Sequence, residues 1–247
     1  MAGRATRLAR LPCSKEIHPV ESHKGTRQSG ESPRAVCEYL FEKMHEAGIT
    51  RAYVILREGK WDIPAYLGDG TRAGMQLAYL MMGRPYGTPY SFDQAYSFVQ
   101  HAIVAFGFPD MVLGPGNIFG RLLEYQGMNH ADVVLGLFPA DRPEKVDMVE
   151  ISGSGRVKRI VIKPQHTDLR TTWGVAVWTP VFTHYMHEFL AAHQEIAERA
   201  PELFMGDVML AAIKEGLSIY ALQVSELPYI DIGTPDDLER ANSPLGD

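Results

Sequence analysis

The sequence predicts an α/β fold in one domain, with a mixed, mostly parallel sheet and helices on both of its faces. Short apolar runs rich in β-branched residues alternate with amphipathic segments of helical spacing, which is typical of such a sheet. Of the 247 residues, 45% are hydrophobic and 22% charged, as in one large globular domain. Because we find no internal repeat and no dividing linker, we expect a single domain over residues 1–247, with a polar surface loop at 22–32.

The first half of the chain alternates helix and strand. Ser32-Pro33 predicts a helix start, apolar residues follow at helical spacing from Val36, and Gly48 predicts the helix end. Ser91 is the expected cap of a second helix. The predicted strands cover 52–56, 75–81, 103–108 and 131–138, and the further predicted helices cover 91–102 and 117–126.

The second half begins with a predicted β-hairpin, because two strand-like runs flank the glycine-rich turn Ser152–Gly155. Thr234 followed by Pro235 predicts a capped helix at the end of the chain. The predicted strands cover 146–151, 156–163, 173–179 and 217–224, and the predicted helices cover 181–198, 206–216 and 234–242.

The bulk charge and the cysteines restrict the class of protein. A formal net charge of -6 disfavours broad nucleic-acid binding. Cys13 and Cys37 are too few for a disulfide scaffold and lack zinc-site spacing, which predicts a reducing, cytoplasmic setting. No apolar run is long enough to span a bilayer, so we expect no membrane partner.

The opening segment is cationic, although the chain as a whole is acidic. Arg4, Arg7, Arg10 and Lys15 occur before the first acidic residue, Glu16. Such a local cluster is where an acidic protein would hold an anionic ligand. A short targeting peptide is the alternative interpretation, which the helix-breaking proline at position 12 disfavours.

Two aspartates follow predicted strands, where open α/β sheets bind their ligands. Asp110 comes just after the strand at 103–108, and Asp231 lies in the segment "YIDIGTPDDL". Either residue alone is also compatible with an ordinary turn or cap. No residue order indicates an acyl-transfer nucleophile, and the absence of GxGxxG disfavours a dinucleotide-dependent oxidoreductase.

Taken in order, the motifs resemble the sugar-phosphate nucleotidyltransferases, the glucose-1-phosphate thymidylyltransferase-like family, over nearly the whole chain. The family's phosphate loop, A-A-G-x-G-T-R-L, resembles "AGRATRL", with Ala5 where a glycine is usual. Its E-K-P segment resembles "GSGRVKRIVIKP", and its ending resembles "YIDIGTPDDLERAN". The other resembling stretches are "SKEIHPV" (14–20), "LGDGTRAGMQLAYLM" (67–81), "FGFPD" (106–110) and "WGVAVWTP" (173–180).

The resemblance implies a Rossmann-like nucleotidyltransferase domain that joins a nucleoside triphosphate to a sugar 1-phosphate and releases pyrophosphate. It also implies a Mg²⁺ ion, a sugar-phosphate-binding part at 146–180, and the possibility of a homo-oligomer. The implied residues are Arg7 and Lys15 for catalysis, Gly3, Thr6 and Gly87 for the nucleotide, Lys163 and Gly174 for the sugar phosphate, and Asp110 and Asp231 for the metal.

The sequence departs from the family pattern at two recognition positions. Met82 stands where a base-recognising glutamine is expected, three residues after Tyr79, although Gly87 keeps its spacing. Ile162 replaces the glutamate of E-K-P. Neither side chain can make the expected polar contact, so base and sugar stay open. A nucleotidyltransferase-like protein that only binds a sugar nucleotide or a partner is therefore the competing hypothesis.

The resemblance also raises an expectation about the sheet. In the family the phosphate loop follows a buried apolar strand, and Met1 stands where that strand would end. We therefore expect two neighbouring strands to lack a ladder partner. We also expect the coding sequence upstream of Met1 to continue in frame with a Val/Ile/Leu run, and an immediate in-frame stop would contradict this.

Overall fold

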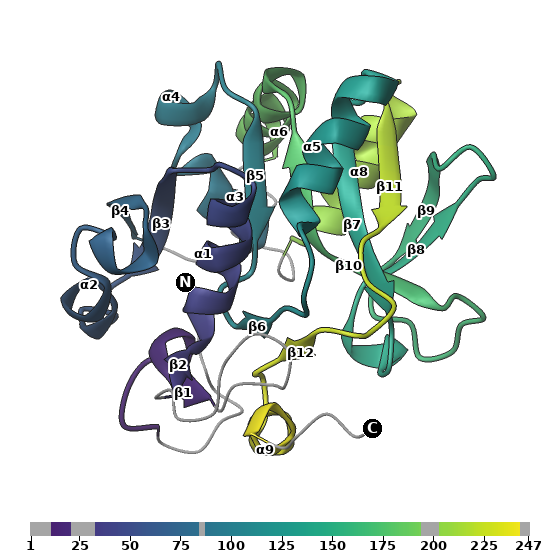
Figure 1. Cartoon of the computed structure of the whole chain (residues 1–247). Helices are drawn as coiled ribbons and strands as arrows, with labels where there is room; N and C mark the ends of the chain where they lie inside the picture. Colours follow the sequence, from purple (N-terminus) through teal and green to yellow (C-terminus); the bar gives the residue numbers. More distant parts are fainter. Residues whose placement is uncertain (1–10, 21–32, 84–86, 194–202, 243–247) are drawn as a thin grey trace.

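The computed structural model describes residues 11–20, 33–83, 87–193 and 203–242 of the chain. Its main sheet has the order β11-β7-β10-β8-β9, with β5 also paired to β10 (Figure 1). These strands are β5 (Val104–Gly107), β7 (Val133–Pro139), β8 (Met148–Ile151), β9 (Val157–Val161), β10 (Thr171–Trp178) and β11 (Ile219–Gln223).

Strand β10 gives the sheet its mixed character. It runs antiparallel to β5, β7 and β8, whereas β11 runs parallel to β7. Strands β5, β7 and β11 therefore share one direction, and β10 opposes them from between β5 and β7. The predicted mixed sheet is confirmed, but its ladders are mostly antiparallel rather than mostly parallel, because β10 opposes its three neighbours and β8–β9 is a hairpin.

Helices cover both faces of the sheet, as predicted. Alternate residues of β7 point to opposite faces: Val134 and Phe138 join one core, and Leu135 and Leu137 join the other. The first core packs against helices α1 (Val36–Glu46) and α5 (Ile118–Asn129). The second core packs against helices α6 (Pro180–Ala192) and α8 (Met205–Lys214).

Smaller elements complete the described chain. Strands β3 (Arg51–Arg57) and β4 (Gln76–Met82) form a parallel pair, whereas β6 pairs antiparallel with β12, and β1 with β2. None of the described helices is both long and apolar enough to cross a membrane. The remaining bounds are β1 (Pro19–Val20), β2 (Arg34–Ala35), β6 (Met111–Val112), β12 (Ile230–Asp231), α2 (Asp62–Leu67), α3 (Thr88–Asp93), α4 (Tyr96–Val99) and α9 (Pro235–Asn242), with 3₁₀ turns at 15–17, 71–73 and 143–145.

The sheet is not continuous from β4 to β11. Within the described ranges, β3 pairs only with β4, and β5 pairs only with β10. Each of these two strands therefore has one ladder partner in the described chain. The prediction of one continuous sheet is wrong for the described chain, because no ladder joins the β3–β4 pair to the rest.

Two helix predictions also need correction. Helix α1 starts at Val36 rather than at residue 33, because Arg34–Ala35 pairs with Pro19–Val20 as strand β2. The helix predicted over 91–102 is two short helices, α3 and α4. Gly87, with a φ of 123°, lets the chain enter α3 at Thr88, so Ser91 lies inside α3 and is not its cap.

Candidate active site

The short β6–β12 pair brings Asp110 and Asp231 to one place. Asp231 lies in β12 opposite Met111, and Asp110 directly precedes β6. The Ile232 N–H donates to the Asp110 carbonyl oxygen at 2.9 Å, which extends the pairing. Two aspartates from distant parts of the sequence therefore share one edge of the domain, as their predicted common role requires.

Lys15 joins these carboxylates from the first described segment. Its ammonium forms an ion pair with the Asp110 carboxylate, and the two side chains are only 14% and 18% exposed. Burial alone would lower the pKa of Lys15, but the negative charges of Asp110, Asp231 and Glu16 raise it. Lys15 is therefore held as a cation beside both aspartates.

The surroundings of Asp231 disfavour the ionised form of its carboxyl group. Its pKa is raised to about 6 by desolvation and by the negative charge of Asp110, while Lys15 counteracts the rise. Because the residue remains exposed to solvent, the charge of Asp110 is the more persuasive cause. Two facing carboxylates with one nearby ammonium leave negative charge that a further cation would neutralise.

The donor set suits a metal ion that arrives with phosphate groups. Among the described residues, no group of three or more His, Cys, Asp or Glu side chains is placed to hold a metal. Mg²⁺ commonly takes one or two carboxylates and completes its octahedron with phosphate oxygens and water. Asp110 and Asp231 fit that pattern, and they do not fit an all-protein cage.

The segment that carries Lys15 is anchored by two acid contacts. Glu16 forms a buried ion pair with Lys60, 2.6 Å between Oε2 and Nζ. Ser14 donates its N–H and its hydroxyl to the two oxygens of Asp62, at 2.6 and 2.8 Å. Both partners lie just after β3, so the segment is fixed at the end of that strand. Sequence reasoning missed Lys60 and Asp62, because no motif links them to residues 14–16.

The loop after Asp231 is fixed by the cap of α9. Thr234 donates its hydroxyl to the Asp237 carboxylate at 2.7 Å and accepts the Asp237 N–H at 3.3 Å. The Arg142 guanidinium pairs with the same carboxylate, and both contacts lower the pKa of Asp237 against the effect of burial. The predicted Thr234 cap is confirmed, and Asp237 has a structural role beside Asp231.

A second polar cluster lies around Lys163, in the segment predicted to hold the sugar phosphate. Lys163 has a φ of 41°, and its ammonium lies 4.1 Å from the centroid of the Phe204 ring. Its backbone N–H lies near the carboxylate of Asp147 and lowers the pKa of that group. Oδ1 of Asp147 is buried and has no hydrogen-bond partner. Burial raises the pKa of Asp147 to about 6, although the charge of Lys163 lowers it.

The structure also shows the surroundings of three further residues that the sequence analysis named. Gly87 has a backbone conformation that other residues rarely adopt. Gly174 is buried in β10, and a Cβ there would lie 2.4 Å from the terminal methyl of Met111 and 3.0 Å from the Tyr229 ring, so a larger residue would force both side chains to shift. Met82 is only 3% exposed, and its sulfur accepts the Ser91 hydroxyl at 3.3 Å. Gly3, Thr6 and Arg7 lie outside the described residues.

Comparisons with known proteins agree on one family. The profile of the nucleotidyl transferase family matches residues 2–247. The low-salt glycan biosynthesis nucleotidyltransferase Agl11 of Haloferax volcanii is 27% identical over 230 residues, or 92% of this chain and 61% of that protein. A glucose-1-phosphate thymidylyltransferase of Streptomyces griseus is 24% identical, again over 92% of this chain and 61% of that protein. The chain thus spans about three fifths of the length of these curated relatives.

A solved structure shares the fold. It is a Bacillus anthracis protein assigned to the glucose-1-phosphate thymidylyltransferases, in complex with a sucrose. The TM-score is 0.78, with all of this chain and 95% of that chain covered. At 18% sequence identity, this likeness supports the fold alone.

Proposed function

Because the chain belongs to the nucleotidyl transferase family, we propose that it joins a nucleoside triphosphate to a sugar 1-phosphate, giving a nucleotide-sugar and pyrophosphate. The convergence of Lys15, Asp110 and Asp231 at one edge of the domain is the observation that supports this most directly. An ammonium beside two carboxylates suits the handling of polyphosphate with a divalent cation.

The proposed reaction is a single in-line displacement. A phosphate oxygen of the sugar 1-phosphate forms a bond to the α-phosphorus of the triphosphate. The bond from that phosphorus to the bridging oxygen breaks, and pyrophosphate leaves with the bonding electron pair. No covalent enzyme intermediate is required, so the protein contributes position and charge. Lys15 would lie beside the transferring phosphoryl group as a fixed positive charge.

Asp110 and Asp231 would hold Mg²⁺ in this scheme. When bound, the ion neutralises phosphate charge and supports the in-line geometry. Lys15 pairs with Asp110, and we propose that this ammonium turns toward phosphate oxygens when substrates bind. Asp231, whose negative charge is the less well compensated, would gain most from the cation.

The other proposed ligands divide between the two substrates. Arg7, Gly3, Thr6 and Gly87 would bind the nucleotide, and Lys163 and Gly174 the sugar phosphate. Asp147 is an addition to the sugar side: its carboxylate lies next to Lys163 and offers an acceptor where Ile162 offers none. We propose that it accepts a hydrogen bond from the sugar, which favours sugars that carry a donor at that position.

The reaction is tested with a panel of common nucleoside triphosphates and hexose 1-phosphates. We expect at least one pair to release pyrophosphate when Mg²⁺ is present and none to do so after chelation. The measurement is a coupled pyrophosphate assay on the folded, full-length chain. If every pair fails with Mg²⁺ present, the catalytic proposal is wrong, and direct binding of nucleotide-sugars then tests the competing hypothesis of a binding protein.

Asp147 gives a prediction that needs no substrate. Its pKa rises from 3.8 to about 6 on folding, so folding favours the protonated carboxyl. The free energy of unfolding therefore decreases as pH rises from about 4 to about 6, where the folded chain must ionise this buried group. We expect Asp147→Asn to unfold with a free energy higher than wild type by on the order of 2 kcal/mol at neutral pH and by little near pH 4. Denaturant unfolding at several pH values measures this, with Asp168→Asn, an exposed site in the same segment, as control. A difference that does not vary with pH would contradict it.

A further inference from the structure

An ion pair between Arg142 and Asp237 lies next to Asp231, one of the two carboxylates proposed to bind the metal. Arg142 follows the end of β7 and precedes the 3₁₀ turn at 143–145, and Asp237 lies in the first turn of α9. Strand β12, which carries Asp231, is followed by α9 (Figure 1). The ion pair therefore joins the carboxyl end of an inner strand of the sheet to the segment that holds Asp231.

The carboxylates of Asp231 and Asp237 are neighbours, although the two residues belong to different elements. A Cβ built at Gly233 would lie 3.6 Å from an oxygen of each of them. Asp237 is only 3% exposed, whereas Asp231 is open to solvent. A buried charge beside a second carboxylate is costly unless a cation compensates it, and Arg142 supplies that cation.

The charge of Arg142 also acts on Asp231. Desolvation and the charge of Asp110 raise the pKa of Asp231, and both Lys15 and Arg142 counteract the rise. Burial alone would lower the pKa of Arg142, but its hydrogen bond to Asp237 and the nearby carboxylates, including Asp231, raise it. Arg142 is therefore held as a cation whose charge reaches a proposed metal ligand.

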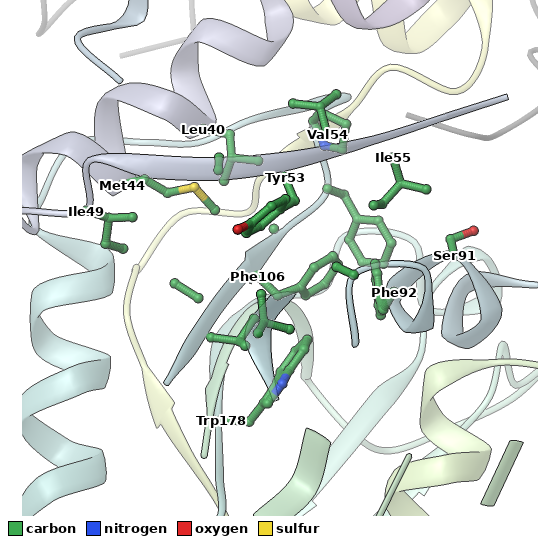
Figure 2. A pocket seen from close by; sticks show the side chains of 18 of the residues that line it. Leu40, Met44, Ile49, Tyr53, Val54, Ile55, Ser91, Phe92, Phe106 and Trp178 are labelled. Atoms are coloured by element: carbon green, nitrogen blue, oxygen red, sulfur yellow. The ribbon is translucent and has the colours of Figure 1, made fainter. Parts of the chain in front are cut away.

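Lys15 and Arg142 compensate different carboxylates. Lys15 and Asp110 border a mainly apolar cavity of about 690 Å³ next to β3 and β5 (Figure 2). In the part of the chain that the structure describes, Arg142, Asp231 and Asp237 are not among the residues that line this cavity. Asp110 therefore has Lys15 as its cation, and the two carboxylates of β12 and α9 share Arg142.

The balance of these charges decides which ions the group attracts. Lys15 and Arg142 oppose the three carboxylates of Asp110, Asp231 and Asp237, so the group carries a net negative charge. A divalent cation would reverse that charge and allow phosphate groups to bind. Without Arg142 the group would be more negative, which would attract the cation more strongly and repel polyphosphate.

We propose that Arg142 is a second fixed cation of the substrate site, a positioning residue that acts through Asp237 and Asp231 and favours polyphosphate over the free metal ion. The inference rests on the proposed function, because it assigns Arg142 to the binding of the same triphosphate and pyrophosphate. No motif in the sequence analysis contains Arg142. Its role follows from an ion pair between residues 95 positions apart in the chain.

An ion pair that only holds the fold together would behave differently when Arg142 is replaced. Its loss would loosen the connection between β7 and α9, and Asp231 would be held less firmly. The affinities for the cation and for polyphosphate would then fall together. Because removal of a positive charge strengthens one interaction and weakens the other, opposite changes in the two affinities distinguish the proposed role from a structural one.

The test measures two dissociation constants of the full chain without substrates. Binding of Mn²⁺ alone is followed by electron paramagnetic resonance, and binding of pyrophosphate alone by titration calorimetry with a chelator present. For Arg142→Gln we expect Mn²⁺ to bind about three- to tenfold more tightly and pyrophosphate roughly tenfold more weakly. Arg142→Lys keeps the charge, so both dissociation constants should stay within about twofold of those of wild type.

Two further variants serve as controls. Combining Arg142→Gln with Asp237→Asn removes one charge of each sign, so both constants should return to within about twofold of wild type. This double variant also leaves no unpaired buried carboxylate, which keeps the test possible if Arg142→Gln alone unfolds. Arg159→Gln removes an exposed positive charge from the β8–β9 hairpin and is expected to change neither constant. Circular dichroism checks that each variant is folded.

Three outcomes would overturn the proposal: weaker binding of both ions by Arg142→Gln, unchanged binding of both ions, or an Arg142→Lys variant that behaves like Arg142→Gln. Neither measurement involves turnover. A failed substrate panel with opposite shifts of the two constants would therefore contradict the proposed reaction alone. A productive panel with parallel shifts would contradict the role of Arg142 alone.

Discussion

Replacing Asp231 with asparagine is expected to lower turnover by about 10²–10³-fold, the loss typical when one preorganised charged or polar group is removed from a transition state. Asparagine keeps the shape of the side chain but not the charge that would bind Mg²⁺. The free energy of unfolding should not fall, because the raised pKa of Asp231 means that its ionised form is not favoured by folding.

The measurement compares pyrophosphate release and denaturant unfolding for wild type, Asp231→Asn and Asp236→Asn. Asp236 is exposed in the first turn of α9, so its replacement controls for loss of one nearby negative charge. Asp110→Asn is expected to lower turnover similarly, and it also removes the partner of Lys15. Wild-type turnover in either the Asp110 or the Asp231 variant would remove that residue from the proposed metal site.

Glu16→Gln is expected to destabilise the chain by about 3–5 kcal/mol, because it leaves the buried Lys60 ammonium without its counter-charge. Glu16 and Lys60 are 1% and 4% exposed, and 2.6 Å separates their charged atoms. Removing both charges together, as in Glu16→Leu with Lys60→Met, should cost less than Glu16→Gln alone, since no isolated charge remains.

The control for this prediction is Glu150→Gln, which breaks an exposed pair with Arg159 and should cost under about 1 kcal/mol. Denaturant midpoints of the four proteins decide the outcome. If Glu16→Gln and Glu150→Gln lowered the free energy of unfolding equally, the buried ion pair would contribute no more to stability than the exposed one. Because Glu16 follows Lys15 directly, Glu16→Gln should also reduce turnover at temperatures where it is still folded.

The elements that the sequence predicted well have local causes. Strand β7 was recognisable because it is apolar on both faces, and helix α9 because Thr234 caps it. The prediction failed where distant residues decide a local boundary. Helix α1 begins later than predicted because residues 34–35 pair with β1 as a strand. The segment after Gly87 enters a helix earlier than predicted because that glycine has a positive φ.

The candidate site was only partly accessible from the sequence. Its motifs named Lys15, Asp110, Lys163 and Asp231, since the order of those motifs along the chain carries the resemblance. Asp147, Lys60 and Asp62 were missed, because each matters through a contact with a residue far away in the sequence or through burial. Neither a contact of that kind nor the burial of a single charge leaves a periodic signal.

The sequence by itself determined the layered α/β fold, the order of most elements and the family, because periodicity and ordered motifs are local properties of the chain. Only the tertiary structure decided which groups meet. The pairing of β6 with β12 places two like charges together and raises the pKa of Asp231 to about 6. Likewise, the apolar runs of β3 and β5 predicted two strands, but only the tertiary structure placed them on either side of one cavity, with no ladder between them in the described ranges. Electrostatic and ladder energies depend on distances that tertiary packing sets.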